Sequence, residues 1–208
     1  MKTSTVGKQN VRQIQASARR QQILEAAVRL FAQKGVARTT TRQIAQEAGV
    51  AEGLIFKYFP TKPDLLRALT GTPHIFLGDL REILKDVKGR PVAEVMGRVA
   101  TVWLELLHRE ADISSILFGE ALINPEIGGI VYQVIEEGAA VIGQFLDDGK
   151  KAGKITRGVD TGTIAHMYMS SILMFFLRYR NLNDKEWKKE SSIFAENLRA
   201  AWLRMVTP

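Results

Sequence analysis

The sequence has no cysteine among its 208 residues, and this absence excludes several kinds of site. Without thiols the chain forms no disulfide framework, no thiolate nucleophile and no Cys-ligated zinc site. Histidine is scarce as well: His74, His108 and His166 have no partners at metal-ligand spacing, so neither a metal nor another cofactor is predicted. The Walker A, G-x-G-x-x-G, H-E-x-x-H and G-x-S-x-G motifs are also missing, which argues against an enzyme.

Long apolar runs are missing too. The longest, residues 167–177, has eleven residues and includes Ser170 and Ser171, whereas a membrane-spanning helix needs about 20. The first five residues lead into polar sequence instead of the apolar segment of a secretory signal. We therefore expect no membrane partner, and the predicted location is cytoplasmic.

Acidic residues are scarce in the first third of the chain. Residues 1–62 contain eleven Lys and Arg but only three acidic residues, Glu25, Glu47 and Glu52, so this part has a net charge of +8. The net charge of the whole chain is +7. The remaining 146 residues carry 18 basic and 19 acidic side chains and are nearly neutral. Such asymmetry favours a polyanionic partner, either nucleic acid or an anionic membrane surface, with a merely solubilising face as the alternative.

The chain has the periodicity of helices. Apolar residues recur three and four positions apart, and no stretch alternates apolar and polar residues for long, so the predicted fold class is all-α without a sheet. Thr40 and Gln43 have the spacing of a capping box, and Gly35 and Gly49 mark helix ends. We expect helices at residues 17–34, 41–49, 51–59, 63–84 with a break at Gly71-Thr72-Pro73, 91–108, 112–121, 125–152, 161–179 and 185–206.

Two short helices joined by a tight turn containing Gly49 indicate a helix-turn-helix motif. Residues 35–62, from Gly35-Val36-Ala37-Arg38 to Phe59-Pro60-Thr61-Lys62, resemble the DNA-binding region of TetR-family transcriptional regulators, and about 45 residues from 23 to 66 fit the pattern. The matching positions are the Thr pair, Ile44-Ala45, Ala48-Gly49-Val50, Gly53, the aromatic run to Phe59, and Lys62.

The resemblance implies an N-terminal three-helix DNA-binding head and a larger C-terminal helical domain for ligand binding and dimerisation. We divide the chain into a flexible basic arm at residues 1–16, a helix-turn-helix domain at 17–62 and a ligand-binding and dimerisation domain at 63–208. A recognition helix that enters the major groove need be only a few turns long, because its N-terminal residues reach the base edges. The residues predicted to contact DNA are Thr40, Thr41, Arg42, Ala51, Glu52, Gly53, Phe56, Lys57, Tyr58 and Lys62.

Two of these positions depart from the family pattern. Glu52 stands where many relatives carry a basic or small polar residue; its carboxylate either accepts from cytosine or contacts the helix dipole in the first turn. Phe56 replaces a common tyrosine and lacks a phosphate-seeking hydroxyl. Lys62 is expected to hold a phosphate at a helix N-terminus, and the hydroxyls of Thr40 and Tyr58 to contact the DNA backbone.

The basic segment before the motif contains Lys2, Lys8, Arg12, Arg19 and Arg20. One interpretation is a flexible arm that follows phosphates or enters a minor groove, and the other is an idle tail.

By resemblance, the larger domain binds an inducer among its central helices and forms a homodimer through its last two. Residues 161–179 are apolar on nearly every side and need cover from a partner, which agrees with that dimer. Large or soft side chains are expected to line the pocket, although plain core packing is the alternative for each of them. These candidates are Trp103, Leu107, Phe118, Leu122, Tyr132, His166, Met169, Met174 and Phe175.

Taken together, the sequence predicts a repressor that binds a palindromic operator as a dimer and is released by a small apolar or amphipathic molecule. The ligand is expected to move the helix that begins at Pro63 and to spread the two recognition helices. The alternatives are a DNA-binding protein without sequence preference, a peripheral membrane protein that uses the basic arm, and an enzyme.

Overall fold

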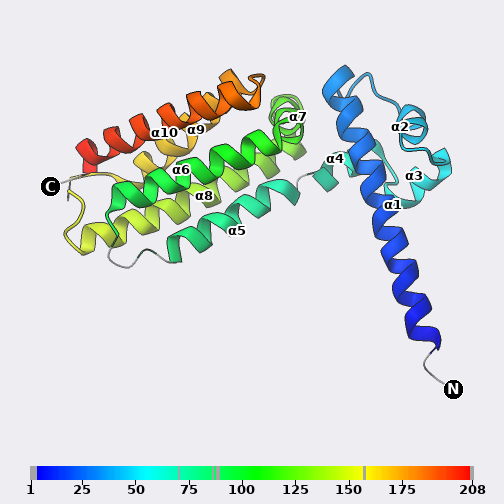
Figure 1. Cartoon of the computed structure of the whole chain (residues 1–208), viewed down its shortest axis with the longest axis horizontal. Coiled ribbons are helices and arrows are strands. Elements are labelled where there is room, and N and C mark those ends of the chain that lie inside the picture. The colour runs from blue at the N-terminus through cyan, green and yellow to red at the C-terminus, as the bar shows by residue number, and fades with distance from the viewer. Residues whose placement is uncertain (1–3, 70, 86, 88–89, 157, 207–208) are drawn as a thin grey trace.

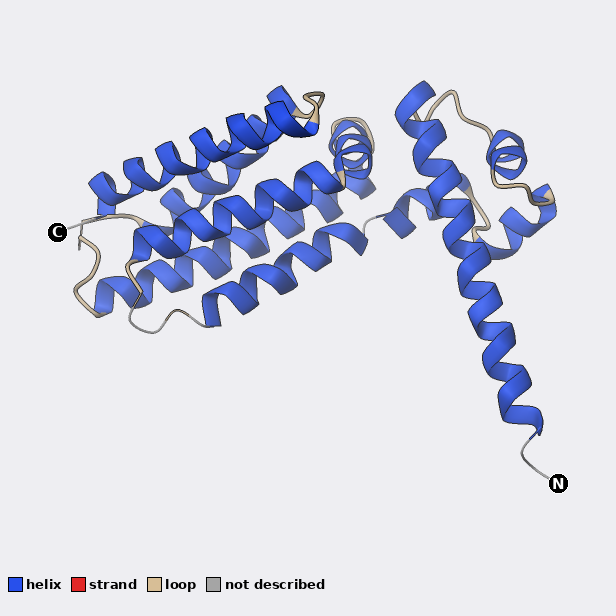
Figure 2. Ribbon diagram, viewed as in Figure 1, coloured by secondary structure: helices blue, strands red, loops and turns tan. Residues whose placement is uncertain are grey.

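The structure is a computed structural model that describes residues 4–69, 71–85, 87, 90–156 and 158–206, with the backbone alone for 4–12, 72–76 and 205–206. Across these residues the regular structure is entirely helical, as predicted (Figures 1 and 2). The helices are α1 (Ser4–Lys34), α2 (Thr41–Glu47), α3 (Glu52–Tyr58), α4 (Lys62–Leu69), α5 (Gly71–Lys85), α6 (Val92–Arg109), α7 (Ala111–Ala121), α8 (Pro125–Lys151), α9 (Thr161–Tyr179) and α10 (Asp184–Val206).

Helices α1 to α4 form a small head at one end of the molecule (Figure 1). The capping box that opens α2 is confirmed: the Gln43 backbone N–H donates to Thr40 Oγ1, and the Gln43 side chain accepts from the Thr40 N–H. Gly49 adopts a φ of 63° in the turn between α2 and α3, a region that residues with a Cβ rarely occupy. Because this turn is tight, α2 and α3 pack on α1 around one apolar cluster that includes Ile23 and Ile44.

Helices α5, α6, α8, α9 and α10 form the larger body, and their packing follows from apolar stripes of helical period. Helix α6 buries residues three and four apart along its whole length, from Val92 to Leu107. Asn124 caps the start of α8, and Asp160 caps α9 by accepting from the Thr163 N–H at 2.6 Å. None of the described helices combines the length and the apolarity needed to cross a membrane.

The first helix begins at Ser4, so the predicted start near residue 17 is wrong. Local propensity permits this, because residues 4–16 contain no proline and a single glycine and include Lys, Arg, Gln and Ala, which are good helix formers. Once the buried half of α1 is folded, each added residue gains a backbone hydrogen bond without a new nucleation step. The basic extension is therefore helical. Residues 1–3 of the predicted arm lie outside the described residues.

The core of the head extends beyond the predicted domain end at Lys62. Leu65, Leu66 and Leu69 of α4 are buried in the same apolar cluster as α1, α2 and α3. Helix α4 ends at Leu69 and α5 begins at Gly71, so the predicted break at Gly71-Thr72-Pro73 falls within the first turn of α5; residue 70 lies outside the described residues.

Candidate nucleic-acid interface and ligand cavity

The outer face of α2 and α3 exposes a set of side chains with no role in the core of the head. Arg42 on α2 and Gly53, Phe56 and Lys57 on α3 are exposed, as is Ala51 at the N-cap of α3. Ile55, on the opposite side of α3, is completely buried. The recognition helix therefore has one side fixed in the core and another side free to meet DNA. Tyr58 lies at the edge and is only partly exposed.

Three polar residues predicted to contact DNA form hydrogen bonds within the head. The Thr41 hydroxyl donates to Glu52 Oε1 at 2.9 Å, which ties the first turn of α2 to the first turn of α3. The carboxylate of Glu52 thus positions the recognition helix, and its place in the first turn also suits the helix dipole. Thr40 accepts the capping bond and keeps its own O–H to donate to a phosphate.

Lys62 has a different environment from the one its sequence position suggested. Its Nζ donates to the Val36 carbonyl at 2.7 Å and to the Thr39 carbonyl at 3.0 Å. These bonds fasten the start of α4 to the loop between α1 and α2, where the Thr39 hydroxyl is itself buried and donates to the Gly35 carbonyl. The ammonium of Lys62 is therefore turned into the head, where it holds the loop that precedes α2.

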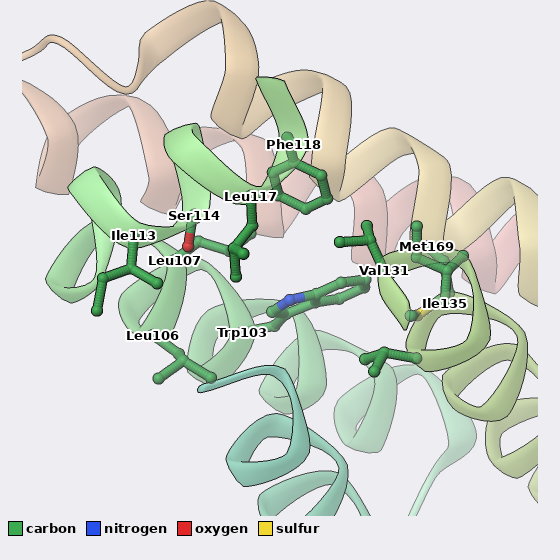
Figure 3. Close-up of a pocket in the computed structure, with 11 residues that line it drawn as sticks. Trp103, Leu106, Leu107, Ile113, Ser114, Leu117, Phe118, Val131, Ile135 and Met169 are labelled. Atoms are coloured by element: carbon green, nitrogen blue, oxygen red, sulfur yellow. The ribbon is translucent and has the colours of Figure 1, made fainter. Parts of the chain in front are cut away.

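A cavity of about 60 Å³ lies where α6, α7, α8 and α9 converge, and Figure 3 shows the residues around it. Trp103 and Phe118 face each other across this space, and Met169 closes it from α9 (Figure 3). Ser114 brings a hydroxyl to a wall that is otherwise hydrocarbon or aromatic. The lining consists of Trp103, Leu106, Leu107, Ile113, Ser114, Leu117, Phe118, Val131, Val134, Ile135 and Met169.

The structure brings four of the nine predicted ligand-binding residues to this cavity: Trp103, Leu107, Phe118 and Met169. The other five lie elsewhere, because the helical period places them on different faces from those that converge. Phe175 is buried against Phe194, with 4.4 Å between ring centroids.

Four of those five are on the surface. Leu122, Tyr132 and Met174 are exposed by 79%, 54% and 63%. His166 is exposed on α9, where its Nε2 lies 2.9 Å from Glu136 Oε2. This contact has the larger effect on the pKa of His166, and a hydrogen bond with the Gly162 carbonyl has a smaller one; both raise the pKa above its ordinary value.

Sequence reasoning named only Phe118 on the α7 and α8 side of the cavity, and it also missed Leu106 on α6. Ile113, Ser114 and Leu117 recur at intervals of one and three residues on α7, and Val131, Val134 and Ile135 recur at three and four on α8. That period shows that each helix has an inward side, but it does not show which inward residues border a void. Nor do the described residues bring three His, Asp or Glu together at metal-binding distance; the side chain of His74 is not among them.

A helix-turn-helix with one exposed face, joined to a helical body that encloses an apolar cavity, is the arrangement of a DNA-binding regulator. The family model "Bacterial regulatory proteins, tetR family" matches residues 23–69, which are the buried part of α1 together with α2, α3 and α4. The head of the chain is therefore a TetR-family DNA-binding region, and the whole chain has the fold of TetR-family regulators. Its relatives are regulators, and this chain is accordingly a regulatory protein and not an enzyme.

Similarity to known proteins extends beyond the head. The chain is 29% identical over 163 residues to the uncharacterised HTH-type transcriptional regulator YvkB of Bacillus subtilis, covering 78% of this chain and 84% of YvkB. A tetR-family regulatory protein from Rhodococcus RHA1 has a similar fold, with a TM-score of 0.73, 20% identity, and coverage of 91% and 97%. FadR of B. subtilis, solved with stearoyl-CoA, gives a TM-score of 0.68 at 21% identity, with coverage of 86% and 95%.

Proposed function

We propose that this regulator is a repressor that binds a palindromic operator as a homodimer and is released by a small apolar or amphipathic molecule. The observation that carries the proposal is the position of α7. Ser114, Leu117 and Phe118 of this helix line the cavity, while Ile116 and Leu117 belong to the apolar cluster of the head. A ligand that displaces α7 therefore acts directly on the DNA-binding unit.

The size of the cavity makes such a displacement necessary. Small-molecule sites usually enclose about 300–1,000 Å³, whereas this cavity encloses about 60 Å³. A ligand must open it, and an apolar ligand that binds only the open form shifts the population towards that form. The lining favours a long apolar chain or a ring system with one polar group near the Ser114 hydroxyl. Because FadR of B. subtilis was solved with stearoyl-CoA, acyl-CoA thioesters are the first ligands to test.

A second connection joins the body to the head through Arg67 on α4. Its guanidinium pairs with Glu126 in the first turn of α8 and with Asp64 on its own helix. Helix α4 is thus held both by the head cluster and by the helix that forms one wall of the cavity. We propose that movement of α7 and α8 turns α4 and with it the recognition helix. This agrees with the expected movement of the helix that was predicted to begin at Pro63.

The proposed homodimer uses the outer faces of α9 and α10. Met167 and Met174 are exposed two turns apart on α9, and Ile193 and Leu203 are exposed on α10. A monomeric protein rarely leaves large apolar side chains gathered on adjacent helices, so a second copy is the occupant we propose for this face. A dimer also places two recognition helices at the 34–36 Å spacing of successive major grooves.

The test begins with DNA selected by the full chain from a random-sequence library. Footprinting of the selected duplex should show two half-sites about 10 base pairs apart, related by two-fold symmetry. Acyl-CoA thioesters of increasing chain length, including stearoyl-CoA, should then reduce the affinity for that duplex, and a reporter under its control should be repressed in cells. Protection without symmetry or sequence preference would favour the non-specific alternative. A thioester that raises thermal stability but leaves DNA affinity unchanged would refute the coupling.

The dimer is tested separately by substitution. Met174→Glu places a carboxylate in the proposed apolar interface and should shift the protein to monomer in sedimentation experiments. Thr101→Glu adds the same charge at an exposed position of α6 and should leave the dimer intact. A dimeric Met174→Glu variant would show that the two copies meet through another face.

A further inference from the structure

The N-terminal half of α1 is a helix that extends away from the rest of the head (Figure 1). Residues 13–20 are exposed at every position, and buried residues of α1 begin only at Ile23. At a rise of about 1.5 Å per residue, residues 4–20 extend about 24 Å. The family model matches from residue 23, so this extension lies outside the region that the family shares.

The extension carries cations and no acid. Its described part contains Lys8, Arg12, Arg19 and Arg20, and the first acidic residue of the chain is Glu25. Lys8 and Arg12 are four residues apart and Arg12 and Arg19 seven apart, intervals that place all three positions on one side of a helix. Three positions that the sequence makes cationic therefore fall on one side of the extension.

The basic side of the extension is the side on which α1 meets the helix-turn-helix. Arg19 precedes the buried Ala26 by seven residues and Arg12 precedes the buried Ile23 by eleven, both close to whole helical turns. Two contacts at the base of the extension confirm this direction. Gln22 Nε2 donates at 2.8 Å to the carbonyl of Ala48, the C-cap of α2, and the Arg20 guanidinium lies 5.1 Å from the centre of the Phe59 ring, next to α3. The basic side therefore faces the side of the head on which α2 and α3 lie.

The helical form of the extension decides how it can touch DNA. A helix with its side chains is about 10–12 Å across, whereas the minor groove is about 6 Å wide. The helix body is therefore too wide to lie within an undistorted minor groove. Contacts from Lys and Arg to backbone phosphates require no insertion.

We propose that the N-terminal extension of α1 is a second DNA-binding element, which contacts phosphates outside the half-site read by α3 and adds affinity without sequence preference. This inference rests on the proposed binding of DNA by α2 and α3. A membrane surface is the less favoured partner, because the basic side faces the helix-turn-helix that carries the proposed DNA-reading helix α3. Ile14, at 62% exposure, is the single large apolar side chain exposed between residues 13 and 20.

The experiment uses the full chain and the duplex selected from a random-sequence library. The variant K8Q/R12Q/R19Q removes three charges from the extension, and K154Q/K185Q/K188Q removes three from exposed positions of the body as a matched control. Each lost phosphate contact should lower the slope of log affinity against log salt by about 0.9, or by up to about 5 for the six sites of a dimer. The control should keep the wild-type slope.

Duplex length provides the decisive second measurement. A helix of about 24 Å spans about seven base-pair steps of 3.4 Å. Shortening each flank of the duplex by that length should lower the DNA affinity of the wild type and leave the DNA affinity of the extension variant unchanged. Equal slopes for the variant and wild type on the long duplex would overturn the inference while leaving recognition by α3 intact. If the full chain selects no duplex, the proposed function itself fails. If the variant loses binding to anionic vesicles and keeps its DNA affinity, the partner is a membrane and the inference is wrong.

Discussion

Replacement of Lys62 by methionine tests whether this residue holds the head together or binds phosphate. The substitution keeps an unbranched side chain as far as Cε and removes the ammonium that donates to the Val36 and Thr39 carbonyls at 2.7 and 3.0 Å. Hydrogen bonds to charged groups contribute about 1.5–3 kcal/mol each. Because Lys62 is only half-buried, we expect a total loss of about 2–3 kcal/mol, near the lower end for the pair.

For a protein of this size, a loss of 1 kcal/mol lowers Tm by about 2–4 °C, so Lys62→Met should melt about 4–12 °C below the wild type. Circular dichroism and urea unfolding measure the change. The matched control is Lys57→Met, at an exposed position of α3, which should change stability by less than about 0.5 kcal/mol. On DNA the control should lower the salt slope by about 1.8, because the proposed dimer loses one phosphate contact in each protomer.

The opposite pattern would refute the reasoning. If Lys62→Met melts at the same temperature as the wild type and its salt slope falls by about 1.8, the ammonium contacts phosphate and the two carbonyl bonds contribute little. A variant that is both less stable and altered in slope would be resolved by measuring affinity well below its Tm.

Three further predictions concern single positions. Gly53→Ala adds a Cβ that meets no protein atom within 4 Å, so stability should rise by up to about 1 kcal/mol from helix propensity. DNA affinity should fall about tenfold or more, or 1.4 kcal/mol, if α3 lies directly against the bases; binding isotherms decide this. Gly128→Ala places a Cβ 2.8 Å from the Ala121 carbonyl oxygen, and the overpacked α7–α8 crossing should lose about 1–3 kcal/mol in urea unfolding. Contact with Glu136 raises the pKa of His166 above 6.5, so the stabilisation is complete below pH 6.5 and disappears as pH rises through the folded pKa. Because the pair is exposed, His166→Gln should lose only a few tenths of a kcal/mol at low pH and nothing at high pH.

The sequence determined the helices because their signals are local. The Thr40–Gln43 capping box, the turn at Gly49 and the caps at Asn124 and Asp160 act within a few residues, and the structure begins and ends its helices there. The bounds of 161–179 agree at both ends with α9. The family could be predicted for a similar reason, since the matched region is one continuous segment whose residues set its own fold.

Tertiary structure alone decided what each side chain does. Thr41 and Glu52 are eleven residues apart and Lys62 is 23 residues from Thr39, so no local pattern shows that these polar groups bond to one another. A cavity likewise depends on how several helices pack, which is why Met169 lines it while Met174, on the same helix, is exposed. The sequence determined the family, the helices and the location of the charge, because these depend on neighbours along the chain. The direction of each side chain depended on neighbours in space.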